Sequence, residues 1–189
     1  MENNFYFNED ELVKRSIDGD RHYQELLYRK FASKMFSVCL GYAKSREDAK
    51  DILQDSFVKV FTSLKKYRGD GSLEGWIRKI IVNTAIDHNR KALKDLKNIE
   101  IENAMLSTIE ASALENIQTK ELLELIHKLP EGARIIFNLY AVEGYNHIEI
   151  AEMLNIKVGT SKSQFSRARE ILQDLLGKTY QVKTVADYF

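Results

Sequence analysis

Hydrogen-bond donors crowd one segment near the C-terminal end of the chain. Between Lys157 and Glu170 the sequence contains lysine, arginine, serine, threonine and glutamine but no acidic residue. The candidate DNA contacts in this segment are Thr160, Lys162, Ser163, Ser166, Arg167 and Arg169. Lysine and arginine can reach guanine edges in a major groove, and hydroxyls near a helix N-terminus suit phosphate. A solvated helix face is the alternative, but such faces usually mix acids with bases, so the composition favours DNA recognition.

A second basic block lies in the first half of the chain. Nine cations outnumber four acids there, and the cations are Lys65, Lys66, Arg68, Arg78, Lys79, Arg90, Lys91, Lys94 and Lys97. On a helical projection Lys79, Asn83 and Arg90 share one face, with Trp76 at its border. Cations for phosphate and an amide for a base edge are what binding to separated strands would use. For Trp76 by itself, a half-buried core position is the favoured interpretation.

A third group of residues forms an acidic stripe, opposite in charge to the two basic segments. Asp48, Asp51 and Asp55 follow one another at helical spacing, and Gln54 is adjacent. Asp48 alone could be a helix cap, whereas Asp55 lies too deep in the helix for that role. Because an acidic stripe cannot face DNA, it faces either solvent or a basic protein partner. The residues alone leave both possibilities open.

The pattern of breakers and apolar residues predicts an all-α protein. The chain of 189 residues contains one proline and nine glycines, and apolar residues recur with a period near 3.6. Helices are expected up to about residue 19, over 22–45, through 49–64 and from 73 to about 91. The expected organisation is two small helical domains joined by a flexible linker, with the boundaries 5–93, 94–117 (linker), 118–178 and 179–189 (tail).

The second domain follows the pattern of a helix-turn-helix. One helix stops before Pro130, which suits the first turn of the next helix. Asn146, with Glu149 three residues later, predicts a capped short helix. A tight turn at 155–157 then leads into a last helix over about 158–176. A short helix, a turn and a longer helix form the DNA-binding motif of many regulators.

Composition excludes several functional classes. The net charge is zero, so basic surface must come from local segregation. A single cysteine, Cys39, cannot form an internal disulfide, and no apolar run approaches the length of a membrane helix. The N-terminus lacks the order of a secretion signal. No metal-ligand spacing, glycine-rich phosphate loop or nucleophile–base arrangement stands out. The sequence therefore predicts a cytoplasmic protein without membrane insertion, enzymatic activity, metal or other cofactor.

Several motifs, in order, resemble the extracytoplasmic-function (ECF) sigma factors of bacterial RNA polymerase, which contain only sigma regions 2 and 4. The resemblance covers residues 9 to 177. It rests on Glu47-Asp48-Ala49 with Asp51-Ile52-Leu53-Gln54-Asp55-Ser56-Phe57, on Gly75-Trp76-Ile77-Arg78-Lys79 through Asn83 to His88, on Leu129-Pro130, on Ile148-Glu149-Ile150-Ala151-Glu152-Met153-Leu154, and on Val158-Gly159-Thr160 with Ser166-Arg167-Ala168-Arg169.

The resemblance implies a role for each charged surface. The helix carrying Asp48, Asp51, Gln54 and Asp55 would dock on the clamp helices of the polymerase beta-prime subunit. The loop 67–73 and the following helix would open the −10 element and trap a flipped non-template base, with Arg68, Trp76, Lys79, Asn83 and Arg90 as contacts. The donors from Thr160 to Arg169 would face the −35 element. Further implied partners are the polymerase beta flap and an anti-sigma factor.

Two positions depart from the family pattern. Ser161 stands where an apolar residue is usual, which predicts looser packing at the start of the recognition helix. Gln164 stands where a basic residue is common, which predicts weaker phosphate contact or an altered sequence preference. The tail is expected to be disordered or to pack on the second domain.

The predicted function is an ECF sigma factor that recruits core polymerase to specific promoters and assists promoter opening. The alternative is a stand-alone helix-turn-helix transcriptional regulator acting as a dimer. Such a dimer would need a dimerisation surface, and nothing resembling a heptad pattern appears in the sequence. A helical interaction protein that has lost DNA binding is a further rival.

Overall fold

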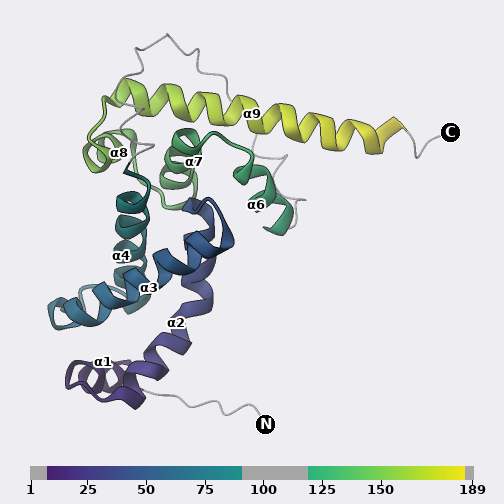
Figure 1. The fold of residues 1–189 in the computed structure, drawn as a ribbon. Coiled ribbons are helices and arrows are strands. Elements are labelled where there is room, and N and C mark those ends of the chain that lie inside the picture. Colours follow the sequence, from purple (N-terminus) through teal and green to yellow (C-terminus); the bar gives the residue numbers. More distant parts are fainter. Residues whose placement is uncertain (1–7, 91–118, 186–189) are drawn as a thin grey trace. The chain divides into compact units, whose positions relative to one another are not determined.

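The computed structural model describes residues 8–90 and 119–185, and within these two stretches the regular secondary structure is entirely helical (Figure 1). The prediction of an all-α protein is confirmed. The chain divides into two compact units, 1–88 and 89–189. The linker expected at 94–117 lies outside the described residues, as do residues 186–189 of the expected tail.

The first unit is built from α1 (Glu9–Ile17), α2 (Arg21–Tyr42), α3 (Arg46–Ser63), the 3-10 turn η1 (Leu64–Lys66) and α4 (Leu73–His88). Polar caps start its first three helices: the side chains of Asn8, Asp20 and Ser45 each accept a hydrogen bond from a backbone N–H in the following turn. These are the boundaries that the sequence pattern predicts to within a few residues. Helix α4 ends at His88, about three residues before its predicted end.

The core of the first unit lies where α2, α3 and α4 pack on one another. Fully or almost fully buried side chains from the predicted apolar stripes fill it: Leu27, Phe31, Met35, Ile52, Phe57, Val60, Leu73, Ile77 and Ile81. Burial of each such side chain stabilises the fold by roughly 1.5–3 kcal/mol. Cys39 of α2 is also fully buried, and this burial raises the pKa of its thiol to about 12. The thiol therefore serves packing in its neutral form.

Exposed polar contacts also link both ends of α4 to neighbouring helices. The Lys34 ammonium on α2 lies 2.6 Å from Glu74 near the start of α4. At the other end of α4, Asp87 pairs with Lys59 of α3 at 3.4 Å, and His88 Nε2 lies 2.9 Å from Asp55 Oδ2. Exposed pairs of this kind contribute little stability. They do hold both ends of α4 against its neighbours.

The second unit contains α6 (Thr119–His127), α7 (Glu131–Phe137), the π-helical turn η3 (Asn138–Val142), α8 (His147–Leu154) and α9 (Val158–Val185). Helix α8 begins with the predicted capping box: Asn146 accepts from Ile148 N and Glu149 N, and the Glu149 carboxylate accepts from Asn146 N. Its C-cap is Asn155, whose φ of 52° lies in the left-handed region. This residue turns the chain sharply into α9.

Helix α9 forms one side of the core of the second unit, and α7 and α8 pack against it (Figure 1). Leu125, Leu129 and Ala133 meet Ala168 and Leu172 of α9 there. The helix continues to Val185, nine residues beyond its predicted end. Residues 179–185 of the expected tail therefore belong to α9, because no proline or glycine after Gly177 stops the helix.

In the described part of the chain, no helix combines the length and apolar character needed to span a bilayer.

Candidate functional site

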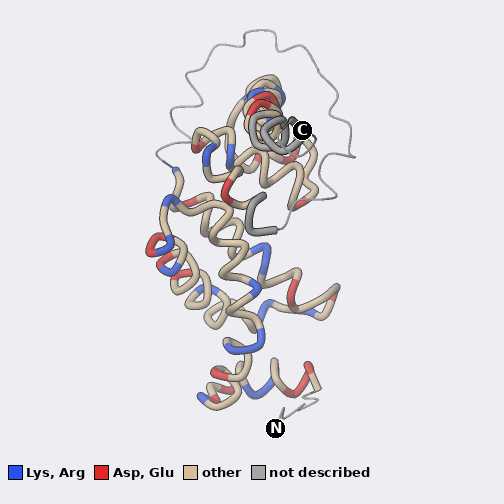
Figure 2. The backbone as a smooth tube through the Cα atoms, turned by 90° about the vertical axis from the view of Figure 1, so that its right-hand side faces the viewer, with Lys and Arg blue, Asp and Glu red and all other residues tan. Residues whose placement is uncertain are grey.

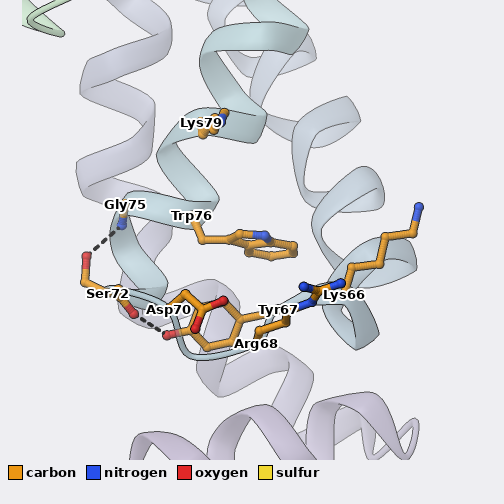
Figure 3. A pocket seen from close by; sticks show the side chains of 9 residues that line it. Lys66, Tyr67, Arg68, Asp70, Ser72, Gly75, Trp76 and Lys79 are labelled. Carbon is orange, nitrogen blue, oxygen red and sulfur yellow. Dashed lines mark hydrogen bonds between the residues drawn. The ribbon is translucent and has the colours of Figure 1, made fainter.

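A concave pocket lies between the loop after η1 and the first two turns of α4 (Figure 3). Its volume is about 390 Å³. Nine residues line it: Lys66, Tyr67, Arg68, Asp70, Gly71, Ser72, Gly75, Trp76 and Lys79. We call this feature the loop pocket. Its walls combine two aromatic rings with three cations.

Local hydrogen bonds give the loop pocket its shape. The Tyr67 hydroxyl donates to the Gly71 carbonyl at 2.7 Å, which closes the loop on itself. Gly71 has a φ of 123°, a conformation that residues with a side chain rarely adopt. Ser72 caps α4 by accepting from Gly75 N at 3.1 Å, and a Cβ at Gly75 would lie 3.1 Å from that hydroxyl oxygen. The loop is thus held close to α4, so the two rings face a common space.

The aromatic and basic side chains of the pocket suit an unpaired nucleotide. The rings of Tyr67 and Trp76 have centroids 5.6 Å apart at an angle of 52°, so they line the pocket without stacking on each other. A planar base can stack on such a ring, and the cations Arg68 and Lys79 can meet its phosphate. Loss of solvent contact and the acids Glu9, Asp10 and Asp70 raise the pKa of Tyr67, which keeps the hydroxyl neutral.

The structure separates the predicted −10 contacts into two groups. Arg68, Trp76 and Lys79 line the loop pocket. Asn83 and Arg90 are exposed, but Asn83 lies farther along α4 and Arg90 lies beyond its end, outside the pocket. Tyr67 also lines the pocket; it begins the loop 67–73 that the resemblance assigned to the −10 element, although it was not among the predicted contact residues.

The acidic residues of α3 also divide into two groups. Asp51, Gln54 and Asp55 are exposed, as a protein-binding role requires. Asp48 instead has a local structural role, because its carboxylate accepts from Lys44 N at 2.8 Å and its own N–H donates to Ser45 Oγ. The same face contains Val58, which is 63% exposed and was missed by the sequence analysis. Its spacing from Asp51 and Asp55 on the helix was the available signal. We call Asp51, Gln54, Asp55 and Val58 the α3 face.

The recognition helix α9 presents some of its predicted DNA contacts and buries others. Lys162 and Arg167 are exposed, and Ser163 is partly exposed. Arg169 is partly buried, with its guanidinium carbon 5.9 Å from the centre of the Phe165 ring. We call Lys162, Ser163, Arg167 and Arg169 the recognition face.

Two predicted donors do not belong to the recognition face. Thr160 is only 4% exposed and Ser166 only 7%, because both point toward the interior of the second unit. The Ser166 hydroxyl donates to the Glu170 carboxylate at 3.3 Å. These side chains are therefore removed from the set of candidate DNA contacts.

The two departures from the family pattern are buried as well. Gln164 is 5% exposed, so it does not take the place of a phosphate-binding cation on the surface. Ser161 is completely buried, and the looser packing expected at this position stays a prediction. Its hydroxyl lies 2.9 Å from His147 Nδ1 of α8, which supplies the polar partner that a buried hydroxyl needs.

Burial and the nearby Lys162 ammonium lower the pKa of His147. We expect a titration of the full chain, followed by the NMR signal of the His147 ring, to show a midpoint below about 6.5, the value of an unperturbed histidine. Because the folded-state pKa is lowered, the related stability is present above the unfolded-state pKa and is lost as the pH falls through the folded-state value. His147→Asn identifies the signal. A midpoint at or above the ordinary value would contradict the packing described here.

Acidic and basic residues are segregated between individual surfaces, and not between the two halves of the chain. Figure 2 shows acidic and basic residues interspersed along the described parts of both units. The α3 face contains two acids, whereas the loop pocket and the recognition face contain most of their charge as lysine and arginine. A neutral chain can therefore present one surface to a basic partner and two to nucleic acid.

Comparisons with known proteins place both units in one family. The family description "Sigma-70 region 2" matches residues 27–94, and "Sigma-70, region 4" matches residues 119–181. The ECF RNA polymerase sigma-E factor of Haemophilus influenzae is 32% identical over 183 residues, covering 86% of this chain and 92% of the relative. The RNA polymerase sigma-H factor of Pseudomonas aeruginosa is 29% identical over 191 residues, covering 89% and 93%.

A solved structure supports the fold. It is the sigma factor RpoE in complex with the anti-sigma factor NepR from Bartonella quintana, with a TM-score of 0.50 and 19% identity. The match covers 80% of this chain and 95% of that one.

Two helical units that match sigma regions 2 and 4 define a transcription initiation factor of the sigma-70 class. Because the similarity to sigma-E factors extends over nearly the whole chain, this protein belongs to the extracytoplasmic-function sigma factors. It recruits core RNA polymerase to specific promoters and assists promoter opening. The stand-alone regulator is not favoured, because the first unit matches a sigma region that such a regulator does not require. Sigma factors are not a class of enzymes.

Proposed function

We propose that this sigma factor uses its three surfaces for three successive contacts in initiation: the α3 face for polymerase, the recognition face for the −35 element, and the loop pocket for the −10 element. The observation that supports this assignment best is the loop pocket. It combines two aromatic rings with three cations beside the first turns of α4. Further exposed polar groups lie along the same helix.

The α3 face docks on the clamp helices of the beta-prime subunit. Asp51 and Asp55 supply negative charge, and the exposed Val58 supplies an apolar contact for the partner. Interfaces of this kind combine a buried apolar anchor with a charged rim. Asp48 contributes indirectly, since it caps the helix that presents the other residues.

The loop pocket captures an unpaired base of the −10 element. Stacking on Trp76 and Tyr67 holds the base, while Arg68 and Lys79 neutralise the adjacent phosphates. Asn83 and Arg90 lie farther along the path of the same strand and contact the neighbouring nucleotides. Because capture needs an unpaired base, this contact favours the open form of the promoter.

The recognition face reads the −35 element as a duplex. Lys162 and Arg167 project from the first turns of α9, where side chains enter a major groove. Ser163 adds a hydroxyl, and Arg169 approaches the phosphates from its position over Phe165. The second unit also binds the polymerase beta flap.

An anti-sigma factor controls the protein by masking the surfaces of both units, as the resemblance to ECF sigma factors implies. The sigma factor works in the cytoplasm alongside polymerase, without catalytic activity of its own and without a metal or other cofactor.

Transcription in vitro tests the whole assignment. We expect the chain, mixed with core RNA polymerase and a promoter library randomised in two blocks, to yield run-off transcripts enriched in a particular sequence in each block. Neither component alone should produce them. Tight binding of duplex DNA by the free chain, with no promoter-dependent transcript in the presence of core polymerase, would instead support the stand-alone regulator.

A further inference from the structure

A polar pair joins the two helices of the helix-turn-helix inside the second unit. Ser161 of α9 is fully buried, and its hydroxyl lies 2.9 Å from His147 Nδ1 at the start of α8. A hydrogen bond depends on direction as well as distance. An apolar contact at the same place would instead tolerate small rotations of α9. The pair therefore restricts the orientation of α9 more tightly than packing alone.

The imidazole of His147 is itself held by aromatic rings on two sides. It stacks on Tyr140 of η3 with ring centroids 4.4 Å apart and an angle of 18°. Phe165 of α9 meets it at 5.7 Å and 65°, and also packs on Tyr140 at 4.5 Å. The ring is thus fixed by η3 and α9 together, so its Nδ1 meets the Ser161 hydroxyl in a defined direction.

This cluster lies directly beneath the recognition face. Ser161 precedes Lys162 in the chain, and Phe165 supports the Arg169 guanidinium at 5.9 Å. A rotation of α9 about its axis would move both cations together. Because base-edge contacts require hydrogen-bond geometry, such a rotation weakens sequence discrimination more than it weakens attraction to phosphate.

We propose that His147 and Ser161 form a positioning pair that sets the rotation of α9 and thereby the sequence specificity of −35 recognition. The proposal rests on the assignment of the recognition face to the −35 element. Neither residue needs to touch DNA. Both act through the orientation of Lys162, Arg167 and Arg169.

The matched variants Ser161→Thr and Ser161→Val test the pair, because they have nearly the same size and differ in the hydroxyl. The measurement is run-off transcription with core polymerase on the −35 library selected by the unaltered protein. We expect Ser161→Val to reduce the preference for the selected −35 sequence over its single-base variants at least fivefold. Ser161→Thr should retain most of the preference. Equal discrimination by the two variants, or a uniform loss over all −35 sequences, would overturn the proposal.

A second pair of variants covers the case in which Ser161→Val does not fold. His147→Phe keeps a ring for stacking and removes the nitrogen, whereas His147→Asn supplies a side-chain acceptor and removes the ring. We expect the preference to be lost in His147→Phe and partly retained in His147→Asn. The opposite order would show that stacking, and not the polar pair, positions α9.

The unaltered protein separates this proposal from the one on which it rests. If it enriches no −35 sequence, the recognition face itself is wrongly assigned and the role of the pair is overturned with it. If it enriches one and Ser161→Val reads that sequence equally well, only the role of the pair is overturned.

Discussion

Replacement of Asp51 and Asp55 together by lysine is expected to abolish binding to core polymerase while the fold is retained. Both carboxylates are exposed on α3, so the change creates no buried charge. Placing like charges opposite one another costs several kcal/mol at an interface, so the two reversals should weaken binding at least about a hundredfold. Fluorescence anisotropy with labelled sigma factor measures the affinity, and circular dichroism checks the helical content.

Controls separate charge from structure in this experiment. Asp18→Lys makes the same reversal at the exposed C-cap of α1, away from the α3 face, and should leave polymerase binding unchanged. Asp55 also pairs with His88, so His88→Ala removes that pair and keeps the carboxylate. If His88→Ala weakens binding as much as the double reversal, the position of α4 and not the charge of α3 is responsible. Unchanged binding by the double variant would refute the docking surface.

Trp76→Ala is expected to slow promoter opening strongly while recruitment to duplex DNA continues. Stacking of a base on an aromatic side chain contributes about 1–3 kcal/mol, so loss of the indole should reduce the open complex by about 5- to 150-fold. Permanganate reactivity of unpaired thymines measures opening, and a mobility shift of the closed complex measures recruitment. A template with a premelted −10 region should restore much of the activity, since the cost of opening is then removed.

The aromatic face of Trp76 can be tested apart from its contribution to packing. Trp76→Phe keeps a ring in the loop pocket and should recover part of the opening activity. Tyr67→Phe keeps the second ring and removes the hydrogen bond that closes the loop on Gly71, so we expect a smaller loss than with Trp76→Ala. If Trp76→Ala opens promoters as fast as the unaltered protein, the loop pocket does not capture a base.

Local signals in the sequence predict most of the fold correctly. Asn146 acts as a helix cap where the pattern places it, and Pro130 directly precedes α7. The apolar stripes become the buried core of each unit. These features depend on neighbours within about four residues, so periodicity and capping chemistry are sufficient to find them.

The candidate site could be predicted only in part, because the exposure of a side chain depends on which neighbouring elements cover its helix. Thr160 and Ser166 have the chemistry of DNA contacts, but packing buries them. Asp48 has the chemistry of a docking residue, but a backbone N–H occupies its carboxylate. Val58 is apolar and yet exposed. Its spacing along the helix suggests this position, but only the exposed fraction of its side chain in the structure demonstrates it.

The sequence by itself determined the helical class, the two-part organisation, the family and the separation of acidic from basic helix faces. The helical class and the separation of acidic from basic faces follow from residue type and spacing along one helix at a time, whereas the family was indicated by the resemblance of several motifs in order. Only the tertiary structure decided which polar side chains remain exposed and which meet a partner. Tyr67 and Trp76 line one pocket, and His147 reaches Ser161, because elements apart in the chain are packed together in space.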